Sequence, residues 1–90
     1  MKKQRLIKTE ERADAQRVAH FLRGLADRIE SGRVVLMDGE QEVAVDLPDA
    51  LTLEVELDRK DKGPKGTKHS LEVEIEWTEG GKEKGSIRLG

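Results

Sequence analysis

Residues 71–77 read Leu71-Glu72-Val73-Glu74-Ile75-Glu76-Trp77, a strict alternation of apolar and acidic side chains that ends on the only tryptophan of the chain. An earlier stretch, residues 51–57 (LTLEVEL), has nearly the same pattern. Successive side chains of a β-strand point to opposite faces, so each stretch has one apolar face and one carboxylate face. We therefore predict two amphipathic strands whose apolar faces share one core.

The clearest helix signal covers residues 15–31. Val18, Leu22, Leu25 and Ile29 recur at helical spacing and form an apolar stripe. Residues at both ends of the segment support these bounds: an aspartate at position 14 suits an N-cap, and a glycine at position 32 suits a left-handed C-cap.

Weaker patterns complete the predicted elements. Strands are expected at residues 33–37 and 42–47, joined at Asp38-Gly39, and a first strand is expected at residues 4–9. Residues 58–69, rich in glycine and lysine, are expected to form a loop. Residues 80–90 are expected to be a flexible extension, with a short last strand at residues 86–89 as the alternative.

The predicted fold is α+β, with one helix packed on one face of a four- to five-stranded, mainly antiparallel sheet in the order β-α-β-β-β-β. Residues 1–79 are expected to form this single domain. The predicted core consists of Val18, Leu22, Leu25, Ile29, Val34, Leu36, Val43, Val45, Leu53, Val55, Val73, Ile75 and Trp77. For Trp77 the alternative is a recognition aromatic at a surface groove.

Composition limits this core and the class of protein. Of 90 residues, 34% are hydrophobic and 40% are charged, so the core must be thin. The chain has no cysteine, which excludes disulfides and thiolate metal sites and suits a reducing compartment. No apolar run approaches the roughly 20 residues that span a bilayer. We therefore expect a cytoplasmic protein without a membrane partner.

The net charge of −2 conceals a block pattern. Residues 34–58 hold eight acids and no Lys or Arg, whereas residues 59–70 hold five bases and one acid. If the two amphipathic strands pair as a hairpin, Glu54 faces Glu74 and Glu56 faces Glu72, which is unfavourable. A staggered register, intercalated Lys and Arg, or a positively charged partner could each relieve this repulsion. A solvated face, a protein or dimer surface and a cation site all remain open.

Two candidate surfaces follow. The first, a candidate interaction surface, is the acidic sheet face together with an apolar patch on the shorter strands, and comprises Glu54, Glu56, Glu72, Glu74, Glu76, Val35 and Met37. The second is a basic loop comprising Arg59, Lys60, Lys62, Lys65 and Lys68. No catalytic, cofactor-binding or metal-ligating set is predicted, because carboxylates that alternate along an open strand neither converge nor lie in a cleft.

The order of these segments resembles the Amphi-Trp domain family. The resemblance rests on residues 21–32 (FLRGLADRIESG), a following hairpin, Leu47-Pro48-Asp49, LTLEVEL and LEVEIEW, and covers about residues 4–78. It implies a small α+β domain with no established activity, ligand or cofactor. Two departures are visible: Asp14 replaces an expected serine-like cap, and the segment from Gly80 onward extends past the usual end.

Two functions are compatible with these features. The favoured one is a non-catalytic protein-interaction or self-association module that uses the acidic outer sheet face, with a protein partner or a homodimer. The alternative is a nucleic-acid-associated module that acts through the basic N-terminus and residues 59–70. An enzyme is not expected.

Overall fold

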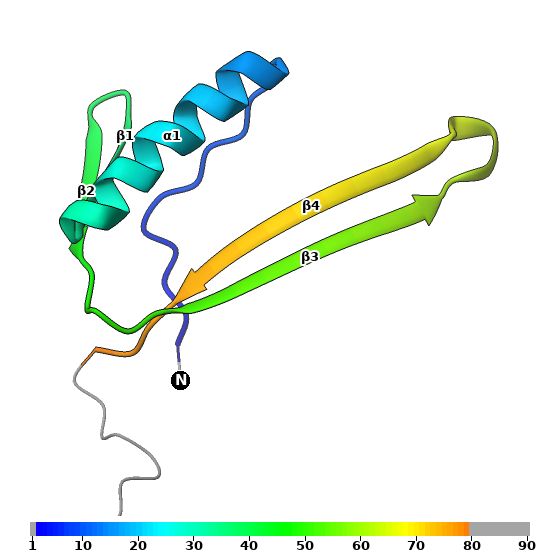
Figure 1. Cartoon of the computed structure of the whole chain (residues 1–90). Helices are drawn as coiled ribbons and strands as arrows, with labels where there is room; N and C mark the ends of the chain where they lie inside the picture. Colours follow the sequence, from blue (N-terminus) through cyan, green and yellow to red (C-terminus); the bar gives the residue numbers. More distant parts are fainter. Residues whose placement is uncertain (1, 80–90) are drawn as a thin grey trace, which may run out of the picture. The chain divides into compact units, whose positions relative to one another are not determined.

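The computed structural model describes residues 2–79, and the chain divides into two compact units, residues 1–49 and 50–90. The first unit contains helix α1 (Ala15–Ser31) and strands β1 (Arg33–Asp38) and β2 (Gln41–Asp46). The second contains strands β3 (Thr52–Asp61) and β4 (Thr67–Glu76), joined by a turn that includes the short 3₁₀ helix η1 (Gly63–Lys65) (Figure 1). The predictions for residues 80–90 lie outside the described residues.

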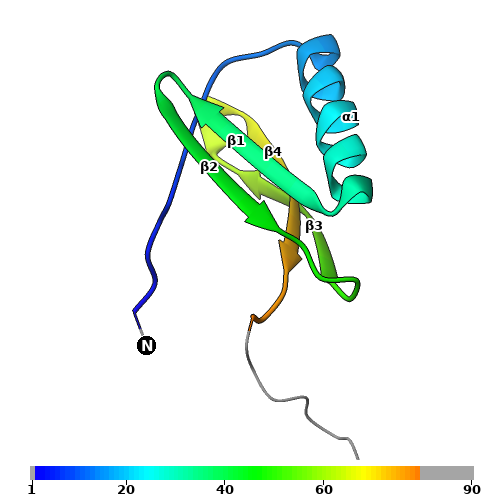
Figure 2. The same ribbon diagram turned by 90° about the vertical axis from the view of Figure 1, so that its left-hand side faces the viewer.

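Helix α1 has the bounds and caps that the sequence predicts. The carboxylate of Asp14 accepts a hydrogen bond from the backbone N–H of Arg17 at 2.8 Å, which satisfies one of the free donors of the first turn. Gly32 ends the helix with φ 85°, and its N–H bonds back to the last carbonyls. The chain then reverses, so that α1 lies along β1 (Figure 2).

Strands β1 and β2 form a short antiparallel hairpin. Its two-residue turn, Gly39-Glu40, follows from the pairing of Asp38 with Gln41, and Gly39 takes φ 60°. Arg33 and Asp46, the outermost pair of the ladder, are joined by an ion pair at 2.9 Å.

The first strand expected at residues 4–9 is absent, since residues 2–14 adopt no regular structure. One Leu-Ile pair with polar flanks supplies too little apolar surface to hold a strand in a ladder. A side chain makes the link instead: Gln41 Nε2 donates to the carbonyl oxygen of Leu6 at 2.7 Å.

Strands β3 and β4 form a long hairpin whose register is the one considered above. Leu53 pairs with Ile75, Val55 with Val73, and Glu54 with Glu74. The ladder also continues past the expected strand ends to the pair Asp61 and Thr67, so most of the expected loop at residues 58–69 is strand. The turn needs few residues because glycines at positions 63 and 66 take positive φ.

The single sheet expected from the sequence is wrong. The described strands make two separate two-stranded sheets, β1-β2 and β3-β4, and each strand pairs only with its neighbour in sequence. Alternation defines the two faces of a strand, but it does not specify which edges pair. The alternation is therefore compatible with two separate hairpins. The α+β class is confirmed, whereas the predicted four- to five-stranded sheet is wrong.

The predicted core is only partly confirmed, because eight of its thirteen residues are buried or partly buried and five are exposed. Among residues 2–79 one hydrophobic residue is buried, Val34, at 8% exposure. On α1, Leu22 is half exposed, while Leu25 and Ile29 are partly buried, as is Trp77 after β4. Several other predicted core residues lie at the surface, namely Val18, Leu53, Val55 and Val73.

Candidate functional site

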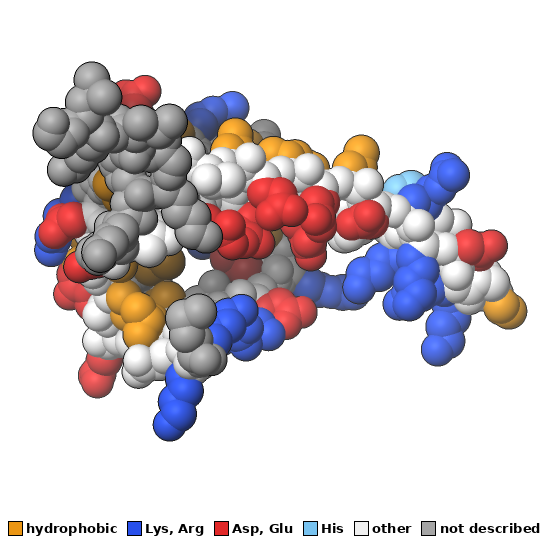
Figure 3. Space-filling model, turned by 90° about the horizontal axis from the view of Figure 1, so that it is seen from below, with side chains coloured by type: hydrophobic (Ala, Val, Ile, Leu, Met, Phe, Trp, Pro, Cys, Tyr) orange, Lys and Arg blue, Asp and Glu red, His pale blue; other side chains and the backbone are white. Residues whose placement is uncertain are grey.

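The carboxylates of the long hairpin gather on one face. Because the register pairs even-numbered residues with even-numbered residues, the two strands present one common acidic face. Its members are Glu54, Glu56 and Asp58 on β3 and Glu72, Glu74 and Glu76 on β4, all exposed. In Figure 3 the acidic side chains cluster along the hairpin, and Lys and Arg side chains lie nearer its tip.

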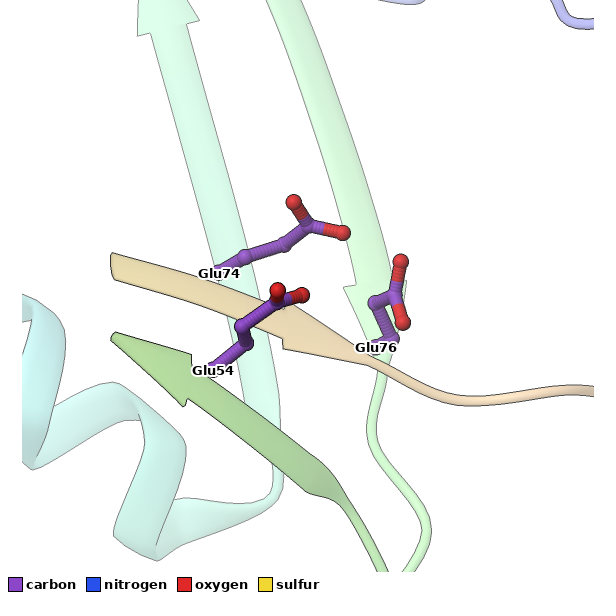
Figure 4. A group of neighbouring side chains, drawn as sticks. All are labelled: Glu54, Glu74 and Glu76. Carbon is purple, nitrogen blue, oxygen red and sulfur yellow. The ribbon is translucent and has the colours of Figure 1, made fainter. Parts of the chain in front are cut away.

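Three of these carboxylates approach one another closely. Glu54, Glu74 and Glu76 project from the same side of β3-β4 (Figure 4), and one carboxylate oxygen from each lies within 4.8 Å of the other two. A hydrogen bond to Glu74 raises the pKa of Glu76 above its ordinary value. Repulsion from Glu74, slight desolvation and repulsion from Glu54 add to this shift.

A second group of carboxylates, Glu56, Asp58 and Glu72, is equally compact. Either group has the oxygen ligands that a hard cation prefers. All six side chains are exposed to water, however, and exposed acidic groups are common without a bound ion. The geometry is therefore that of a repulsive acidic surface in contact with water.

The opposite face of the long hairpin is apolar and exposed. Leu53, Val55 and Leu57 on β3 are 66%, 57% and 75% exposed, and Leu71 and Val73 on β4 are 67% and 57% exposed. Together these five residues form what we call the apolar ribbon. The cross-strand pairs Val55–Val73 and Leu57–Leu71 make it continuous across both strands. A ribbon of this kind is unusual on the surface of a protein that functions alone.

The basic residues of the hairpin do not form one patch. Lys60 and Lys68 are cross-strand partners on the acidic face, whereas Arg59 pairs with His69 on the face of the apolar ribbon. Lys62 and Lys65 belong to the turn. Because its members point to both faces, the expected basic loop is better described as the charged tip of the hairpin.

The apolar patch expected at Val35 and Met37 lies in the first unit, beside the helix. Both residues line a groove of about 510 Å³ together with Phe21 and Leu25 of α1 and Ile7 of the N-terminal segment. Val35 is partly buried there, while Met37 remains 70% exposed. The structure thus places this patch and the hairpin carboxylates in different units.

Sequence reasoning missed the apolar ribbon because it assigned three of its members, Leu53, Val55 and Val73, to the core. One signal was available: with 34% hydrophobic residues, the chain has too little apolar surface to cover both faces of every element. Leu57 and Leu71 extend the alternation toward the tip, beyond the residues assigned to the core, and they are the most exposed members of the ribbon.

The fold and this surface define a class: small α+β proteins in which a capped helix and a short hairpin precede a long amphipathic hairpin that leads into a tryptophan. The chain belongs to the Amphi-Trp domain family, whose model matches residues 1–90. The match includes the residues from Gly80 onward, so the expectation that they extend past the family's usual end is wrong. No curated protein and no solved structure matches the chain.

Within residues 2–79, no helix combines the length and the apolar character that crossing a bilayer requires.

Proposed function

We propose that this protein is a non-catalytic interaction module whose contact surface is the apolar ribbon of the β3-β4 hairpin. The observation that carries the proposal is the exposure of five aliphatic side chains on one continuous face, each by more than half. The sequence alone favoured the acidic face for this role. The apolar face is the better contact surface because its transfer out of water favours association.

The energetics of the hairpin support a covering partner. An isolated two-stranded hairpin is marginally stable in water, because the outer edge of each strand and both faces remain solvated. Full burial of one aliphatic side chain contributes about 1.5–3 kcal/mol, so covering five that are more than half exposed contributes on the order of 5–9 kcal/mol. This gain is large enough to offset much of the cost of association.

The acidic face contributes to specificity. Six carboxylates on the opposite side of the same two strands disfavour a second contact there, because like charges repel and desolvating them is costly. A partner is thereby directed to one side of the hairpin. The same exposed carboxylates give no support to catalysis, which needs groups held together in a cleft.

A matched pair of variants tests this function. Leu57→Lys places a charge on the apolar ribbon at its most exposed position, and Glu56→Gln changes the adjacent residue on the opposite face. Each of the three proteins is immobilised and exposed to cell extract and, separately, to the purified wild-type chain. We expect wild type and Glu56→Gln to retain the same partner and Leu57→Lys to lose it. Equal retention by all three proteins would contradict the proposal. Cell fractionation separately tests the expected cytoplasmic location.

The nucleic-acid alternative has less support. A phosphate-binding surface requires several cations on one face, and the hairpin presents Lys60 and Lys68 among six carboxylates while Arg59 points to the other side. Mixed-sequence DNA and RNA at low salt test it directly. A shift that Lys60→Ala weakens and that high salt abolishes would favour this alternative over the interaction module.

A further inference from the structure

We infer that the partner of the apolar ribbon is a second copy of this chain, an inference that rests on the proposed function. The two hairpins stack apolar face on apolar face, with their tips at opposite ends. A two-fold axis passes between the two copies at the level of the cross-strand pair Val55–Val73. Each copy thus contributes the same ribbon to the contact.

The chemistry of the ribbon favours a copy of itself. Between Leu53 and Leu57 on β3, and between Leu71 and Ile75 on β4, no charged side chain points to this face. A partner must therefore present an equally long, uncharged, apolar strip, because a charge buried against these residues would be costly. The ribbon is such a strip, and a contact about a two-fold axis uses the same surface on both copies, which must therefore match itself.

The charges at the ends of the ribbon select the orientation. Arg59 and His69 form the next cross-strand pair on this face toward the tip, whereas Trp77 follows β4 at the other end. Hairpins stacked with their tips together would bring two Arg59 side chains to the same end of the contact. With the tips opposed, the Arg59–His69 pair of one copy lies above the end of the other copy that carries Trp77. At that end the two-fold axis sets His69 of one copy opposite Trp77 of the other and Arg59 diagonally across from it, and the guanidinium of Arg59 is attracted to the face of the indole ring.

The acidic faces agree with this arrangement. In a stack of two ribbons, the carboxylates of each copy point outward, away from the contact, and remain in water. Two copies that met through their acidic faces would instead bring twelve carboxylates together, six from each hairpin, and would be unstable.

Charge complementation at position 73 tests the inference. The two-fold axis places residue 73 of one copy opposite residue 73 of the other, so Val73→Lys and Val73→Glu each bring like charges together. We expect wild type to be dimeric by sedimentation equilibrium and each variant alone to dimerise about 100-fold more weakly. An equimolar mixture of the two variants should recover a heterodimer, because opposite charges then meet.

Two controls accompany the measurement. Glu74→Gln alters the neighbouring residue on the acidic face and should dimerise as wild type does. Circular dichroism should show the same fold for all four proteins, because Val73 is already 57% exposed. The emission of the single tryptophan should shift to the red when wild type is diluted below its dissociation constant, as its cover is lost.

Three outcomes would overturn the inference. If wild type is monomeric at millimolar concentration but retains another protein in a Leu57-dependent way, the second copy is wrong and the interaction module stands. If wild type is monomeric while the amides of its long hairpin are protected from exchange, the ribbon is covered within one chain, and both proposals fail. If wild type is dimeric but the Lys and Glu variants do not complement each other, the two-fold arrangement is wrong.

Discussion

Glu76 shows how the acidic face affects stability at the level of one residue. The pKa of this carboxyl is raised by a hydrogen bond to Glu74, with repulsion from Glu74 and Glu54 adding to it. The folded protein therefore binds this proton more tightly than the unfolded chain does. The contribution is favourable at low pH and is lost as the pH rises from the ordinary value of 4.5 through the raised value.

We therefore expect Glu76→Gln to raise the thermal midpoint at neutral pH by a few degrees, because it removes the repulsion and keeps a hydrogen-bonding group. As the pH rises above 4.5, the midpoint of wild type should fall relative to that of the variant. Glu42→Gln, on an exposed position of β2, serves as the control and should keep the wild-type slope. Identical pH profiles for wild type and Glu76→Gln would count against the carboxylate cluster.

The N-cap of α1 is a second residue with a measurable effect. Asp14→Ala removes the acceptor of the 2.8 Å bond from the Arg17 N–H and should destabilise the first unit by about 1 kcal/mol. The shift in urea midpoint, followed by helical circular dichroism, measures it. Asp27→Ala removes a carboxylate from the exposed interior of the same helix and should change stability much less. Equal losses for both variants would show that charge, rather than capping, is responsible.

At the scale of the elements, two glycines should respond oppositely to alanine. Gly66 ends the hairpin turn with φ 93°, which alanine adopts only with strain, so Gly66→Ala should destabilise the long hairpin by roughly 1–3 kcal/mol. Gly24 lies inside α1, where an added Cβ would meet only the end of the Arg28 side chain, at 3.3 Å. Gly24→Ala should therefore stabilise the helix by up to about 1 kcal/mol. Hydrogen exchange of the two segments separates the effects, and a stable Gly66→Ala hairpin would contradict the turn geometry.

The elements also show what a single sequence specifies. Local signals placed α1 to the residue, because Asp14 and Gly32 act through neighbouring backbone groups. Alternation and register placed Glu54 opposite Glu74, because strand pairing near a turn is local as well. The assembly of hairpins into one sheet depends on edges and long-range packing, which alternation does not encode. That is why the predicted single sheet failed.

For the whole molecule, the decisive quantity is the balance between apolar surface and available cover. The sequence correctly predicted the carboxylate side of the long hairpin but assigned Leu53, Val55 and Val73 to an interior that the described residues do not form. The candidate site was thus half predictable: its pattern can be read from alternation, whereas its exposure depends on packing between distant segments. A chain with 40% charged residues leaves little to complete such an interior.

The dependence of self-association on salt distinguishes the apolar ribbon from the charged surfaces at this scale. Between 0.1 and 1 M NaCl the screening length falls from about 10 to about 3 Å, which weakens contacts between exposed opposite charges. A contact through Leu53, Val55 and Val73 involves no such pairs, so the dimer Kd should change by less than about threefold. Concentration series in sedimentation equilibrium at both salt levels measure this, with Glu74→Gln as the control. A Kd that rose tenfold or more at 1 M NaCl would place the contact on the charged tip and the acidic face instead.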